Sequence, residues 1–127
     1  MIKRFVTDKA PAPVGPYCQA LAAGNLLFIS GQMGIDPATG LFVTGGVEAQ
    51  ATQVMKNLEA ILVEAGSTWS NVAKVNIYLK DMNDFAAVNQ IYAGFFTDAY
   101  PARCCVEVAR LPKDALVEIE AVAVIGE

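Results

Sequence analysis

The stretch 101–124 constrains the fold most, because it alternates apolar and polar residues in two runs separated by a short turn. The first run, 101–110, begins at a proline, and the second, 116–124, carries Glu118 and Glu120 at its even positions. Alternation with a period of two predicts β-strands, and the Leu-Pro-Lys-Asp sequence between the runs predicts a tight turn. The sequence therefore predicts a closing hairpin.

The register of this hairpin has a consequence for any site built on it. If Leu111 pairs with Leu116, Arg103 and Glu118 share one face but lie six residues apart, which is roughly 20 Å at about 3.3 Å per residue. Two charged groups at that separation cannot hold one small molecule within a single chain. Either they have unrelated roles, or a site is assembled between subunits.

The rest of the chain predicts an α+β fold, with two helices on one face of a mixed, mostly antiparallel sheet. Apolar residues alternate in the predicted strands and recur at i, i+3, i+4 and i+7 in the predicted helices. No linker or repeat divides the sequence, so we expect a single domain spanning 1–127. The expected elements are a strand at 2–6, a hairpin of 18–22 and 26–30, a helix at 47–66, a strand with Ala73, Val75, Ile77 and Leu79 on one face, and a helix from Asn83 or Asp84 to about Ala99.

Histidine is absent from all 127 residues, and this restricts the chemistry more than any other compositional fact. Its absence excludes Ser-His-Asp and Cys-His nucleophile systems and zinc sites of the H-E-x-x-H type. Any reaction must use carboxylates, Arg or Lys, backbone groups and water. We expect neither a metal nor a cofactor.

The cysteines and the charge balance exclude further classes. Cys18, Cys104 and Cys105 are an odd set with no C-x-x-C spacing, and adjacent strand residues point to opposite faces, so neither a disulfide framework nor a shared metal is expected. A net charge of −4 and the lack of a basic run disfavour nucleic-acid binding. No signal peptide or membrane span is evident, so we expect a cytoplasmic protein with no membrane partner.

A low charged fraction, 17%, accompanies 54% hydrophobic residues. Large exposed apolar patches are uncommon on soluble monomers, so this balance suggests a surface that copies of the chain cover.

Several separated motifs resemble the Rid family, also called YjgF/UK-type or L-PSP endoribonuclease-like. They are the run from Ala10-Pro11 through Gly15-Pro16-Tyr17-Cys18-Gln19-Ala20, then Ser30-Gly31-Gln32, Lys80-Asp81-Met82-Asn83-Asp84-Phe85, Asn89, Pro101-Ala102-Arg103 and Pro112-Lys113-Asp114. Val117-Glu118-Ile119-Glu120-Ala121 completes the pattern. Because Arg103 is present, the match is to the reactive intermediate deaminase subgroup. Cys104 departs from the serine that is usual there, and Cys18 occupies a variable position.

The resemblance implies a chorismate-mutase-like fold and a homotrimer with sites in clefts between subunits. It also implies hydrolysis of 2-imino acids, the tautomers of 2-aminoacrylate and 2-aminocrotonate, to 2-keto acids and ammonia, which would protect pyridoxal-phosphate enzymes. Arg103 would bind the substrate carboxylate, Cys105 would offer backbone groups, and Glu118 of a neighbouring chain would position or activate water. The expected lining of the pocket is Tyr17, Ser30, Gly31 and Asn89.

Each of these residues also has a purely structural interpretation. Arg103, Glu118 and Glu120 could belong to a solvated strand face, and Tyr17 could be a core or interface tyrosine. Ser30, Gly31 and Asn89 fit a strand-end turn and a polar helix position equally well. For Cys105 we assign the backbone to the site and treat the thiol as a small buried hydrophobe.

Two other functional classes compete with the deaminase. A ribonuclease or translation inhibitor is a label attached to some relatives, although the acidic composition and the missing histidine argue against it. A non-catalytic protein that binds small carboxylates or holds unfolded clients through its clefts or apolar surface is the other alternative.

Overall fold

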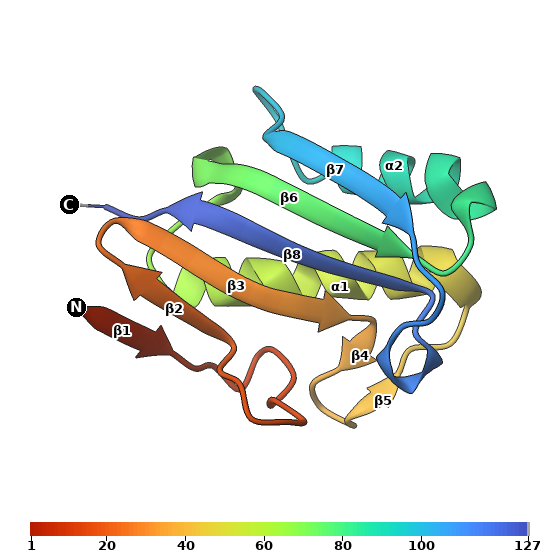
Figure 1. Ribbon diagram of the computed structural model, residues 1–127, viewed down its shortest axis with the longest axis horizontal. Helices are drawn as coiled ribbons and strands as arrows, with labels where there is room; N and C mark the ends of the chain where they lie inside the picture. Colours follow the sequence, from red (N-terminus) through yellow and green to blue (C-terminus); the bar gives the residue numbers. More distant parts are fainter. Residues whose placement is uncertain (127) are drawn as a thin grey trace.

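The computed structural model describes residues 1–126. The chain forms a six-stranded sheet with two α-helices on one of its faces (Figure 1). The strand order is β1-β2-β3-β8-β6-β7, and every neighbouring pair is antiparallel except β6 and β7. The α+β prediction is therefore confirmed. The elements are β1 (Ile2–Phe5), β2 (Ala20–Ala23), β3 (Leu26–Met33), a small β4–β5 hairpin (Ile35–Asp36 and Leu41–Phe42), α1 (Gly46–Glu64), β6 (Val72–Leu79), α2 (Phe85–Ala93), β7 (Ala102–Glu107) and β8 (Val117–Val124).

The core lies between the sheet and the helices. Successive strand residues point to opposite faces, so alternate side chains of β8 and β6 enter this layer. They meet the apolar stripe of α1, whose members recur at helical spacing. The fully buried residues with the largest side chains include Leu27, Val54, Met55, Leu58, Ile61, Leu62, Ile77, Leu79 and Ile119.

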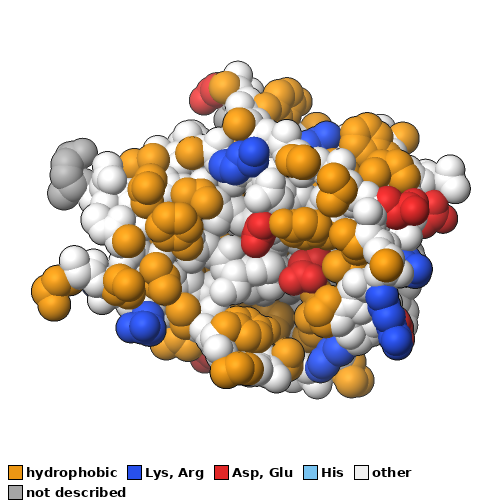
Figure 2. Space-filling model, in the orientation of Figure 1, with side chains coloured by type: hydrophobic (Ala, Val, Ile, Leu, Met, Phe, Trp, Pro, Cys, Tyr) orange, Lys and Arg blue, Asp and Glu red, His pale blue; other side chains and the backbone are white. Residues whose placement is uncertain are grey.

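No helix of residues 1–126 covers the other face of the sheet, and we call it the open face. Figure 2 shows apolar side chains spread across it, with acidic side chains near its middle. Leu26, Phe28, Val106 and Val124 are large apolar residues of β3, β7 and β8, and each remains 38–42% exposed. About two fifths of the surface of each of these residues is therefore left without cover by residues 1–126.

The predicted hairpin of 101–110 with 116–124 is wrong. β7 pairs in parallel with β6, and β8 lies on the other side of β6, so the two runs are not neighbours. Alternation identifies a strand but not its partner, and here a third strand inserts between two runs that are close in sequence. Arg103 aligns with Val75 on the helix-covered face, whereas Glu118 is on the open face, so the prediction that they share a face is also wrong.

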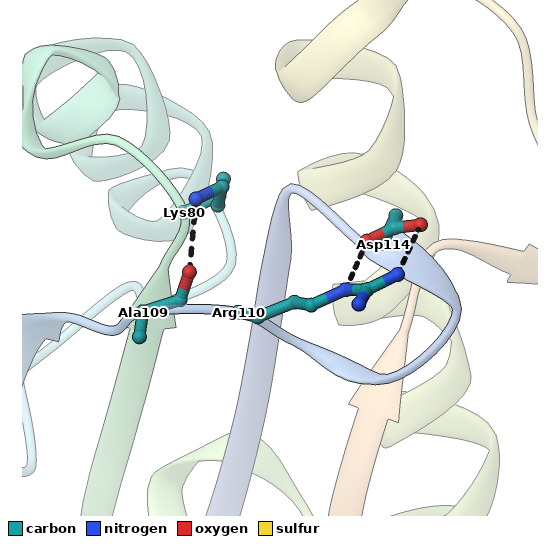
Figure 3. A network of polar contacts seen from close by, with 4 residues as sticks. All are labelled: Lys80, Ala109, Arg110 and Asp114. Carbon is teal, nitrogen blue, oxygen red and sulfur yellow. Dashed lines mark hydrogen bonds and ion pairs between the residues drawn. The ribbon is translucent and has the colours of Figure 1, made fainter.

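The connection from β7 to β8 crosses the end of β6 and is held by polar contacts (Figure 3). The Lys80 Nζ donates a hydrogen bond to the Ala109 carbonyl at 2.9 Å, and the Arg110 guanidinium pairs with Asp114 at 2.7 Å. Lys113 and Asp114 adopt positive φ angles of 57° and 58°, which close the crossing with a short 3-10 turn.

Two local expectations also differ from the structure, and a third is confirmed in part. α2 ends at Ala93 rather than near residue 99, because the chain turns at Gly94; Phe95 and Phe96 nonetheless pack against the core from the following loop. Ala73 is exposed, since an irregularity between Val72 and Lys74 shifts the register. Asp84 is the N-cap residue of α2 as predicted, but its side chain makes no capping hydrogen bond; Asp81 instead caps the preceding 3-10 turn by accepting from the Asn83 backbone.

Neither helix combines the length and the apolar character that crossing a bilayer requires, as far as residues 1–126 are concerned.

Candidate functional site

Arg103 lies on the edge strand β7 and points toward α2. It lines a cleft of about 310 Å³, which we call the Arg103 cleft, together with Asn89 and Tyr92 from α2 and with Tyr100 and Pro101 from the loop before β7. Asn89 is one helical turn from Tyr92, so the period of α2 brings both to the same cleft. The structure thus places two of the predicted site residues, Arg103 and Asn89, together.

Two aromatic rings orient the guanidinium of Arg103. Its Cζ lies 4.9 Å from the centre of the Tyr92 ring and 5.6 Å from that of Phe85, both within the range of cation–π attraction. Arg103 forms no ion pair with a carboxylate of residues 1–126. A planar guanidinium that is held by rings and has no acidic partner is suited to bind an external carboxylate through two parallel hydrogen bonds.

Tyr92 also contributes an unusual polar atom. Its side chain is only 4% exposed, and its buried hydroxyl has no hydrogen-bond partner among the described residues. Burial raises the pKa of Tyr92 to about 12, although the nearby Arg103 acts in the opposite direction. The hydroxyl therefore stays protonated at neutral pH.

Glu118 lies on the open face, in the middle of the sheet. It lines a second cleft of about 340 Å³, the Glu118 cleft, with Tyr17, Ser30 and Gly31 and with the neighbouring Glu120. The ring of Tyr17 is carried by the proline-rich loop, where its hydroxyl accepts a hydrogen bond from the Val14 backbone at 3.3 Å. Four predicted site residues thus meet at this cleft.

Gly31 and Ser30 make room for the Glu118 carboxylate. The pairing of β3 with β8 is interrupted between Ile29 and Gln32, so Ser30 and Gly31 have no direct partner on β8. A Cβ on Gly31 would overlap the Glu118 carboxylate, so glycine permits this close approach. The Ser30 hydroxyl donates to the Cys18 carbonyl at 2.7 Å and thereby fixes the start of the irregularity.

The electrostatic environment of Glu118 favours its protonated form. Burial raises the pKa of Glu118, and the negative charge of Glu120 raises it further. A carboxylate of raised pKa accepts protons more readily than an ordinary surface glutamate, provided that it is ionised at the working pH.

Cys105 belongs to neither cleft. Its side chain is half-buried and packs against the core, and burial raises the pKa of its thiol. The thiol therefore remains protonated and unreactive at neutral pH. Because β7 pairs only with β6 within residues 1–126, the outer edge of this strand leaves backbone groups available to a ligand.

The two clefts are separate within one chain. Arg103 aligns with Ala121 through Val75, and Glu118 aligns with Val106 through Tyr78. The two residues are therefore about 10 Å apart along the strands and about 10 Å apart across them, on opposite faces. No small carboxylate can contact both side chains of one subunit.

Four residues that surround these charges are not among the predicted site residues. Phe85, Asn89 and Tyr92 follow one another at i, i+4 and i+7, which places all three on one side of α2. Asn76 and Tyr78 lie beside Glu120 and Glu118 on the open face. No sequence signal indicated this, because it depends on the pairing of β6 with β8.

The described residues offer no cluster of three His, Cys, Asp or Glu side chains that could bind a metal ion. The three cysteines are free thiols. The available chemical groups are therefore the guanidinium of Arg103, the carboxylates of the Glu118 cleft, hydroxyls and backbone groups.

Comparison with known proteins agrees with this fold. The family model for Endoribonuclease L-PSP matches residues 7–125. A RutC family protein of Pyrococcus horikoshii is 56% identical over 117 residues, covering 92% of this chain and 93% of the relative. The 2-iminobutanoate/2-iminopropanoate deaminase of Mus musculus is 50% identical over 124 residues, covering 98% of this chain and 92% of the relative.

A solved structure, E. coli TdcF with bound serine, superposes with a TM-score of 0.93 at 42% identity and covers 98% of this chain and 99% of that one. This chain belongs to the Endoribonuclease L-PSP family, which is the Rid family indicated by its motifs.

Proposed function

We propose that this protein hydrolyses reactive 2-imino acids, the tautomers of 2-aminoacrylate and 2-aminocrotonate, to 2-keto acids and ammonia. The observation that carries the proposal is the guanidinium of Arg103, which two rings orient and which has no acidic partner in residues 1–126. Two relatives support it: the deaminase of Mus musculus at 50% identity, and TdcF, whose structure holds an amino acid.

The substrate is already electrophilic at C2, so the protein mainly has to orient it beside a water molecule. Arg103 would bind the carboxylate by a two-point contact. Backbone groups at the free edge of β7, near Cys105, would accept the imine N–H. Oriented binding of this kind removes much of the entropic cost of a bimolecular reaction.

Glu118 would act as the base. The oxygen of water forms a bond to C2 of the protonated imine while Glu118 takes a proton from that water, and the electron pair of the C=N double bond stays on the nitrogen, which becomes an amine. Glu118 then gives this proton to the amine, the C–N bond breaks with its electron pair leaving on ammonia, and the hydroxyl proton passes back to Glu118 as C2 becomes a ketone. Ammonia takes that proton and leaves as ammonium, which restores the carboxylate. General base help of this kind contributes about 10²–10⁴-fold.

A second copy of the chain has to complete the site, since one chain keeps Arg103 and Glu118 on opposite faces. The exposed apolar side chains of the open face, among them Phe28 and Val124, are the surface that such a copy would cover. We propose a homotrimer, in which Glu118 of one subunit faces Arg103 of the next. A cytoplasmic location is part of the same proposal.

The direct test couples the purified protein to threonine dehydratase and follows the formation of 2-ketobutyrate. The protein should accelerate this formation beyond spontaneous hydrolysis, Arg103→Ala should abolish the acceleration, and Arg4→Ala should leave it unchanged. Arg4 is a matched control because it is an exposed arginine on β1, at the opposite edge of the sheet. Full activity in Arg103→Ala would defeat the proposal.

A mixing experiment tests whether the two charges come from different subunits. Arg103→Ala and Glu118→Gln are each expected to be inactive, and co-refolding them in equal amounts should restore about a quarter of the sites in a closed ring of subunits. If the co-refolded sample stays inactive while each variant assembles normally, the shared site is wrong.

The same preparations decide between the competing classes. RNA cleavage that survives repurification and is lost in Arg103→Ala would favour a ribonuclease. Suppression of client aggregation that persists in Arg103→Ala, without imine hydrolysis by the parent protein, would favour a holdase.

A further inference from the structure

Glu120 is tethered on the open face by two side chains of β6. The Tyr78 hydroxyl donates to Glu120 Oε2 at 2.6 Å, and the Asn76 amide donates to the same oxygen at 3.1 Å. The register explains both contacts, because Asn76 is the direct cross-strand partner of Glu120 and Tyr78 is that of Glu118. Two glutamates and two polar side chains thus form one compact group on adjacent strands.

The tether fixes where the charge of Glu120 lies. A hydrogen bond from a hydroxyl to a carboxylate is short and strong, and 2.6 Å is at the short end of the usual range. The interaction with Glu120 raises the pKa of Tyr78 to about 12, with burial as a smaller cause. Tyr78 therefore keeps its proton and remains a donor throughout the neutral range.

Glu118 is two residues along the same strand and on the same face, so its carboxylate and that of Glu120 line the same cleft. Residues two apart on a strand are separated by about 7 Å. A like charge at that distance favours the protonated form of its neighbour. Burial and the charge of Glu120 are the two causes that raise the pKa of Glu118.

We propose that Glu120, held by Asn76 and Tyr78, is a positioning residue that makes Glu118 a stronger base. This inference rests on the proposed function of Glu118. Glu120 itself is directed to the tether and need not contact the substrate. The contribution of Asn76 and Tyr78 is to keep the second carboxylate beside Glu118 instead of letting it turn into solvent.

In the proposed trimer, Arg103 of the next subunit faces Glu118 and opposes the effect of Glu120, and this cation is the same in every variant compared below. Within one chain, the other charged or titratable groups near Glu118 come from three segments. Tyr17 lines the same cleft from the proline-rich loop. Lys80 follows β6 and directs its ammonium to the Ala109 carbonyl, and Lys74 lines a neighbouring hollow with Asn76 and Glu120. Cys104, on β7, is close enough to Tyr78 to affect the pKa of its hydroxyl. Among the described residues, Glu120 is the one charged group that raises the pKa of Glu118, and burial is the other cause.

The test is a ¹³C NMR titration of the Glu118 side-chain carboxyl in the assembled protein, which requires no catalytic activity. In Glu120→Gln, the midpoint of Glu118 should move to lower pH than in the parent protein. In Tyr78→Phe, which frees the carboxylate of Glu120 from its strongest donor, the midpoint should move in the same direction by less. Glu59→Gln, at an exposed position of α1, is the matched control and should not move it.

An unchanged midpoint in both Glu120→Gln and Tyr78→Phe would overturn the proposal, as would an equal shift in Glu59→Gln. If Glu120→Gln fails to fold, Tyr78→Phe decides alone.

In the imine assay, the acidic limb of kcat/KM should move to lower pH with the NMR midpoint, and kcat at its plateau should fall more than KM changes. If the parent protein shows no imine hydrolysis, the proposed function fails, but the NMR titration still decides whether Glu120 tunes Glu118.

Discussion

The two faces of the sheet are built from the same strands but differ in how far a single chain completes them. On the helix-covered face, every second residue of β8 from Val117 to Ala123 is buried at 4% exposure or less. On the open face, the intervening residues remain partly exposed and include both glutamates of the Glu118 cleft. The first face stabilises the folded chain and also carries Arg103 at its edge strand, whereas the second carries Glu118 and the apolar side chains that the proposed assembly would cover.

The sharpest test of this difference is a truncation on the covered face. Ile77, on β6, is fully buried on the face of the sheet that the helices cover. Ile77→Ala should lower the free energy of unfolding by about 2–5 kcal/mol, because it removes buried methyl groups and leaves a cavity. Denaturant titration measures this loss. A cost below about 1 kcal/mol would show that the covered face is not the main source of stability.

A charge on the open face should affect association instead. Phe28 is 42% exposed in the chain, and Phe28→Asp should leave the secondary structure intact while sedimentation shows subunits of lower mass. Val63→Asp is the matched control, because Val63 is an exposed apolar residue on α1, outside the sheet. An unchanged mass in Phe28→Asp would mean that this part of the open face is not an interface.

A methyl group at Gly31 tests how closely the Glu118 cleft is fitted. The flexible carboxylate of Glu118 can move away from the new Cβ, so Gly31→Ala should change the melting temperature little. The same movement would misplace the proposed base, and a displacement near 1 Å costs about 10²-fold in rate. The measurement is kcat/KM for imine hydrolysis beside a thermal melt. Wild-type activity would show that the position of Glu118 does not matter.

The smallest effect is expected at the buried hydroxyl of Tyr92. Tyr92→Phe removes an unpartnered buried polar atom and should raise the free energy of unfolding by about 1 kcal/mol. The pKa of Tyr92 is 10.0 ordinarily and about 12 in the folded chain, so ionisation in the unfolded state lowers stability as pH rises above 10. Tyr92→Phe should lose that part of the alkaline decline. A destabilised Tyr92→Phe would reveal a hidden partner for the hydroxyl.

Most helices and strands could be predicted from the sequence, because buried apolar residues recur about every 3.6 positions in a helix and every second position in a strand. The apolar stripe of α1 and the apolar positions of 117–124 are the residues that are buried between the helices and the sheet. Pairing could not be predicted, since the position of β6 between β7 and β8 depends on contacts between distant segments. Arg103 and Glu118 were wrongly predicted to share a face because β7 was paired with β8, whereas β6 lies between them.

The candidate site could be predicted only as a list of residues. Family motifs indicated Arg103, Glu118 and the lining residues, and the structure gathers these into two clefts; their roles stay predictions. The tether of Glu120 could not be predicted, because Asn76 and Tyr78 occupy ordinary strand positions until β6 is placed beside β8.

The central place of β8 also matters while the chain is being made. β8 is synthesised after all the other strands of residues 1–126, yet it joins the β1-β2-β3 half of the sheet to the β6-β7 half. Until residue 124 is available, both halves present unpaired inner edges, and such edges invite aggregation. Nascent chains that stall shortly before this strand should therefore depend on chaperones, whereas the finished chain closes both edges in one step.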